Sequence, residues 1–133
     1  MTENSRARLD QCVDTIESGY EYFLAYAAQG RRTDRDTGAA TSEVRSHLEK
    51  MIAAMDELDS VVRDCAGTAA TDVLESSGAF FDAVAEDAAK AAGALRLTLA
   101  RSDISSQLID NLNASIHVRA LLTDLFIIDE ALR

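Results

Sequence analysis

The two histidines, His47 and His117, are the residues whose chemistry depends most on their neighbours. A carboxylate–histidine metal site on a helix places a glutamate three residues before the histidine, because both side chains then reach one ion. Glu43 instead precedes His47 by four residues, and Ala114 occupies the corresponding position before His117. We therefore expect no metal site and no bound cofactor.

The residues that follow the first histidine read His47-Leu48-Glu49-Lys50-Met51. This fragment resembles the phosphoacceptor helix of histidine phosphotransfer domains, in which a lysine three residues after the histidine neutralises phosphate charge. Lys50 matches that lysine, whereas Met51 replaces the small glycine of the family. The leucine expected in the family is misplaced here, at Leu48, directly after the histidine. The resemblance implies phosphotransfer at His47 in a four-helix bundle. The alternative is a histidine on the flank of a helix, without a phosphoryl group.

Arg119 is predicted to face the interior, since it projects onto the centre of an apolar helical stripe. That stripe consists of Leu108, Leu112, Ile116, Leu122 and Phe126. A buried guanidinium without a partner costs several kcal/mol, so we expect a carboxylate from another helix. Glu17, Glu21 and Glu43 are equally good candidates. Alternatively, Arg119 and Ser115 line a polar pocket for a small anionic ligand, with Ser77 and Thr98 nearby.

The sequence contains no other pattern typical of a catalytic site. A glycine-rich phosphate loop, a GxSxG nucleophile turn and a cysteine–histidine pair at catalytic spacing are all missing from it. We therefore expect a protein without enzymatic activity.

Tyr22 and Tyr26 are candidates for contact with a partner. They lie one helical turn apart and well away from the core stripe that contains Tyr20 and Phe23. Amphipathic rings at partly exposed positions are typical of interface anchors. The alternative, which the sequence favours equally, is that both rings cover the seam with a neighbouring helix.

The apolar periodicity predicts four helices that would hold these side chains in place. They cover about residues 5–29, 42–66, 70–101 and 103–132. Ser5, Thr41 or Ser42, and Ser102 or Asp103 are expected to cap helix starts, and Gly30 to end the first helix. Because two of the three connections are short, neighbouring helices are expected to run antiparallel. The predicted fold is a single all-α domain, an up-down-up-down four-helix bundle.

Composition supports this fold class and limits the partners. The 133 residues contain no proline or tryptophan and carry a formal net charge of −10. Nucleic acids and anionic membrane surfaces attract clustered Lys and Arg, so we expect neither as a partner. The N-terminal residues lack an apolar signal core, and no apolar run approaches the length of a membrane span. A cytoplasmic protein is expected.

The last predicted helix carries a second apolar seam, which is expected to face away from the core. Its members, spaced by three and four residues as in a coiled coil, are Val118, Leu121, Leu125, Ile128 and Leu132. If the stripe around Arg119 closes the bundle, this seam needs a partner to cover it. The predicted function is therefore protein–protein association, as a homodimer through this seam with Tyr22 and Tyr26 nearby, or with another helical protein. The alternative is a ligand-binding or signalling bundle that uses Arg119 or His47.

Overall fold

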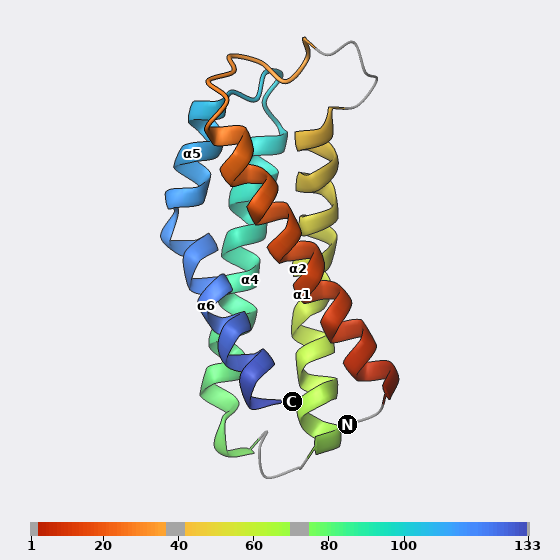
Figure 1. The fold of residues 1–133 in the computed structure, drawn as a ribbon. Helices are drawn as coiled ribbons and strands as arrows, with labels where there is room; N and C mark the ends of the chain where they lie inside the picture. Colours follow the sequence, from red (N-terminus) through yellow and green to blue (C-terminus); the bar gives the residue numbers. More distant parts are fainter. Residues whose placement is uncertain (1–2, 37–41, 70–74, 133) are drawn as a thin grey trace.

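The computed structural model describes residues 3–36, 42–69 and 75–132, and within these ranges the chain is all-helical. Figure 1 labels the helices, which are α1 (Glu3–Ala27), α2 (Glu43–Ala69), α4 (Gly78–Leu99), α5 (Ser106–Ala114) and α6 (Ile116–Ala131). In the part of the chain that is described, no helix has the length and apolar character needed to cross a membrane.

The predicted end of the first helix and the predicted start of the second lie close to the ends of these helices in the structure. Ser42 precedes α2, and its Oγ accepts a hydrogen bond from the backbone N–H of Arg45 at 3.4 Å. Gly30 follows α1 with a φ of 66°, a left-handed conformation that favours glycine. Ser5, in contrast, lies inside α1 and does not cap it. Residues 37–41 and 70–74, which include the predicted cap Thr41, lie outside the described residues.

The prediction of one helix over residues 103–132 is wrong, because the helix is interrupted at Ser115. Ser115 has a ψ of 131°, and its side chain accepts a hydrogen bond from the backbone N–H of His117, so it caps a new helix. The first of the two helices is capped by Ser105, whose Oγ accepts from the backbone N–H of Leu108 at 3.0 Å, and not by Ser102 or Asp103. Residues 106–131 therefore form two helices in succession, α5 and α6.

This interruption changes which face of α6 is buried. The prediction that the second seam faces away from the core is therefore wrong. All five seam residues lie in the core of this chain: Val118, Leu121, Leu125, Ile128 and Leu132. Phe126 and Ile116, which the sequence pattern places in the core stripe, are 60% and 72% exposed. The helical projection failed because it continued the phase of α5 through Ser115, where the backbone is not helical.

The packing of the helices leaves α1 and α6 only loosely associated. α2 lies against both α1 and α4, α5 packs on α1, and α6 packs mainly on α4. A Cβ at Gly19 of α1 would collide with the side chain of Met51 in α2, so these two helices approach closely there. Figure 1 shows α1 crossing the array obliquely, so that its N-terminal half diverges from α6.

A buried carboxylate, Asp34, joins three segments at the end of the molecule where α1 ends and α2 begins. Its Oδ2 accepts hydrogen bonds from Ser42 Oγ at 2.6 Å and from Arg45 Nε at 2.7 Å. Its Oδ1 accepts from the backbone N–H of Ile104 at 3.0 Å. Burial by itself raises the pKa of Asp34, but these donors outweigh it and lower the pKa to about 2. Asp34 is therefore ionised and fully paired at neutral pH.

Candidate functional site

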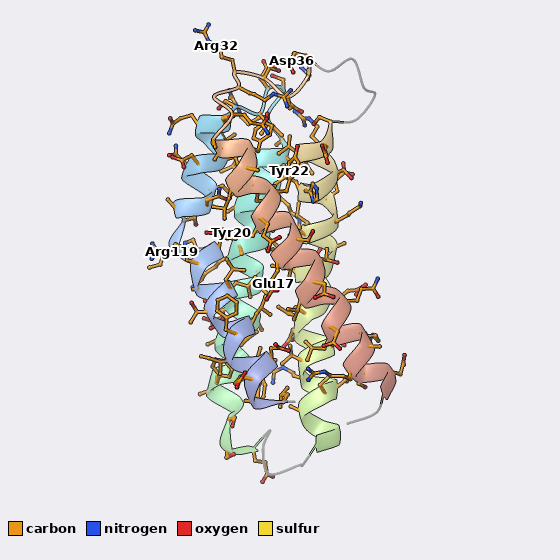
Figure 2. The ribbon with its side chains drawn as sticks, viewed as in Figure 1. Glu17, Tyr20, Tyr22, Arg32, Asp36 and Arg119 are labelled. Atoms are coloured by element: carbon orange, nitrogen blue, oxygen red, sulfur yellow. The ribbon has the colours of Figure 1, made fainter. Side chains whose placement is uncertain are left out.

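An open groove runs between α1 and α6 and has a volume of about 380 Å³. Its walls are formed by Glu17, Tyr20 and Glu21 of α1 and by Arg119, Leu122, Thr123 and Phe126 of α6. In Figure 2, Glu17 and Tyr20 come from the α1 wall and Arg119 from the α6 side. The ring of Phe126 is the largest exposed apolar side chain in this wall. We refer to this feature as the α1–α6 groove.

Arg119 stands at the edge of this groove, so the prediction that it faces the core is wrong. Its side chain is exposed, and no ion pair joins it to a carboxylate among the residues that the structure describes. Of its three predicted partners, Glu17 and Glu21 line the same groove, whereas Glu43 begins α2. Ser115 caps α6 through its side chain and is not among the residues that line the groove with Arg119.

Toward the N-terminus of α1, the groove continues into an acidic hollow of about 330 Å³. The hollow is lined by Asp10, Val13, Asp14, Glu17 and Asp129, and so shares Glu17 with the first part of the groove. Arg6 closes the lower end: its guanidinium contacts Asp10 and Asp129, each at 3.2 Å, and donates to the carbonyl of Leu132.

Glu17 lines both the groove and the acidic hollow, and three other carboxylates lie near it. Partial burial raises its pKa, and the nearby carboxylates of Asp14, Asp129 and Glu21 raise it further. A positive group brought into this hollow would relieve the repulsion. The arrangement is therefore suited to binding a cation next to an apolar surface.

The two tyrosines predicted as partner anchors make contacts within the chain. Tyr26 is fully buried, and its hydroxyl donates to the carbonyl of Ile104 at 2.6 Å. The half-buried ring of Tyr22 stacks on His47 with ring centroids 4.3 Å apart. Tyr26 therefore cannot serve as an exposed anchor. The groove uses Tyr20, which the sequence pattern assigned to the core stripe.

His47 lies in the seam between α1 and α2. Burial under the Tyr22 ring lowers the pKa of His47, although Glu43 opposes that shift. The imidazole is therefore neutral and partly covered at neutral pH.

A pair of carboxyl groups, Asp87 of α4 and Asp124 of α6, lies in the interface between these helices. Asp124 Oδ2 is buried without a hydrogen-bond donor among the described residues. Burial, the hydrogen bond to Asp87 and the negative charge of Asp87 together raise the pKa of Asp124 to about 7. Two carboxylates form a hydrogen bond only when they share a proton, so the pair is satisfied in acid and repulsive in base.

Replacing Asp124 by asparagine should stabilise the protein in a pH-dependent way. The pKa of Asp124 is higher in the folded than in the unfolded state, so its contribution is complete below about pH 4 and is lost as pH rises through about 7. An amide donates to Asp87 at every pH. D124N should therefore stabilise the protein by about 2–3 kcal/mol more at pH 8 than at pH 5.

The measurement is urea unfolding followed by circular dichroism at both pH values. The control is Glu86→Gln, which removes one exposed carboxylate from the same helix pair and should show no such difference. Equal gains for D124N at pH 5 and pH 8 would contradict a shared proton.

A second hollow between α1 and α2 has a volume of about 450 Å³ but is less suited to a partner. Its lining has no run of like charges: it contains two cations, Arg8 and Lys50, and one carboxylate, Glu57. Arg8 is also paired with Asp64 at 3.4 Å. No group of three or more metal-ligating side chains occurs in the ranges that the structure describes. The α1–α6 groove is therefore the strongest candidate site.

Comparisons with protein-family models, curated protein sequences and solved structures found no match to this chain.

Proposed function

We propose that this chain is a non-enzymatic association module that binds a helical segment of another protein in the α1–α6 groove. The observation that carries the proposal is the exposure of Phe126 beside Tyr20 and Leu122, between two helices that pack only loosely on each other. A helix laid in a groove buries its apolar face against such side chains. The proposal keeps the expected class of function but changes the surface, since the seam predicted to bind a partner lies in the core.

We further infer that the helices form an antiparallel four-helix bundle in which α5 and α6 together act as the fourth helix. Support comes from the packing pairs, because α5 covers α1 and α6 covers α4. Such a bundle closes by contact between its first and fourth helices. In this chain that contact is made by α5, which leaves the α6 part open as a groove.

The proposal is tested with a synthetic amphipathic helical peptide that carries one leucine stripe and no net charge. Binding is measured by isothermal titration calorimetry, with a peptide of scrambled stripe as the reference. Wild type should bind the amphipathic peptide at submillimolar concentration, and Phe126→Glu should weaken binding at least about tenfold. The control Ile116→Glu also charges an exposed apolar position of α6, but outside the groove, and should bind like wild type.

Two results would overturn the proposal. One is equal binding of the amphipathic and scrambled peptides. The other is a concentration-dependent dimer, seen by light scattering, that F126E disrupts and I116E does not, because the groove would then bind a second copy of this chain.

A further inference from the structure

The acidic residues of the groove form a stripe along α1. Asp10, Asp14, Glu17 and Glu21 are separated by four, three and four residues, so all four lie on one face of the helix. At 1.5 Å rise per residue the stripe is about 16 Å long, or three helical turns. A helix bound alongside α1 would meet this stripe over its whole length.

The charge of the groove is strongly unbalanced. The groove and the acidic hollow together are lined by five carboxylates, which are the four of the stripe and Asp129, and by one guanidinium, that of Arg119. Arg6 pairs with the carboxylates at the lower end only. Asp14, Glu17 and Glu21 have no ion pair among the described residues. Their charge is therefore available to a ligand.

The apolar surface lies directly beside this stripe. Tyr20 is on α1 between the acidic positions, and Leu122 and Phe126 face it from α6. A ligand that satisfies both surfaces needs apolar side chains on one face and cations on the adjacent flank. These features define a cationic amphipathic helix.

We propose that the α1–α6 groove binds a Lys- or Arg-rich amphipathic helix of another protein, with its apolar face on Tyr20, Leu122 and Phe126 and its cations along the Asp10–Glu21 stripe. This inference rests on the proposed function and adds the chemistry of the partner. A second copy of this chain is a poor occupant, because its net charge of −10 would bring further carboxylates to the stripe.

The test compares two peptides with the same leucine stripe, one carrying lysine on the flank and one carrying glutamine there. The chain has no tryptophan, so Phe126→Trp supplies a fluorescent reporter in the groove. At low salt the lysine peptide should bind this reporter protein at least about tenfold more tightly than the glutamine peptide. The advantage should fall as ionic strength rises, since salt screens exposed charges.

A matched pair of variants distinguishes the groove from the overall charge of the protein. In the F126W background, Asp14→Asn with Glu17→Gln removes two carboxylates from the stripe and should abolish most of the lysine peptide's advantage. Glu49→Gln with Glu86→Gln removes two exposed carboxylates from α2 and α4 and should preserve it.

The outcomes separate this inference from the proposed function. Equal binding of the two peptides would overturn the cationic partner and leave helix docking intact. If neither peptide binds, the proposed function itself fails. An equal loss in both double variants would overturn the stripe as the recognition element, because diffuse charge would then explain the preference.

Discussion

Leu125→Glu is expected to abolish the folded state at neutral pH, whereas Phe126→Glu, one residue further along, is expected to preserve it. Leu125 is 0% exposed and belongs to the core cluster, while Phe126 is 60% exposed in the groove. A glutamate at position 125 loses the buried leucine and places a charge in an apolar interior, which together cost about 5 kcal/mol or more. That is comparable with the whole stability of many domains of this size.

The measurement is helical content by circular dichroism, together with urea unfolding. F126E should change the free energy of unfolding by less than about 1 kcal/mol, as is usual at an exposed position. Leu125→Ala provides a milder test, with an expected loss of about 2–5 kcal/mol from the cavity it creates. A folded, monomeric L125E would mean that the seam faces outward after all, and the orientation of α6 described above would be wrong.

Asp34→Ala is expected to cost about 3–5 kcal/mol, although position 34 lies in a connection and not in a helix. The substitution leaves Arg45 without its carboxylate, and it leaves Ser42 Oγ and the N–H of Ile104 without their acceptor. Asp36→Ala is the matched control two residues away. Asp36 is exposed and pairs with Arg31 at the surface, so its loss should cost less than about 1 kcal/mol.

The pH dependence gives an independent measurement of Asp34. Its pKa is lowered to about 2 in the folded protein, so its contribution is present above the unfolded pKa of about 4 and is lost as pH falls through about 2. The linked free energy is about 2–3 kcal/mol. Wild type should therefore lose more stability than Asp34→Asn between pH 4 and pH 2. Parallel losses in the two proteins would contradict the buried ionised carboxylate.

The end of α1 and the start of α2 were predictable because each depends on local chemistry. Gly30 adopts a left-handed conformation that few other residues tolerate, and Ser42 caps the nearest free N–H groups. The all-helical class was predictable for the same reason, since helix propensity is a property of each residue and its near neighbours. The spacing of the seam from Val118 to Leu132 also correctly identified one continuous apolar face.

The direction of that face could not be predicted, because it depends on a single residue that sequence patterns represent poorly. Serine is tolerated inside helices and favoured at their starts, so the presence of Ser115 does not by itself predict that a helix ends there. Because the helix is interrupted there, the faces of α6 are not aligned with those of α5. As a result, Leu125 is buried, and Arg119 and Phe126 lie at the surface. For the same reason, the sequence pattern did not predict the α1–α6 groove, because it placed Arg119 and Phe126 on the core face.

The sequence by itself determined the helical class and the apolar faces, because these follow from composition and from spacing within one helix. Only the tertiary structure decided which apolar face is covered, which carboxylate is buried and which two helices remain apart. Ile104 lies 70 residues from Asp34 in the chain, and the contact of Asp34 with Ile104 and Arg45 depends on where three segments meet. Relations of this kind depend on packing between elements, which periodicity within an element does not encode.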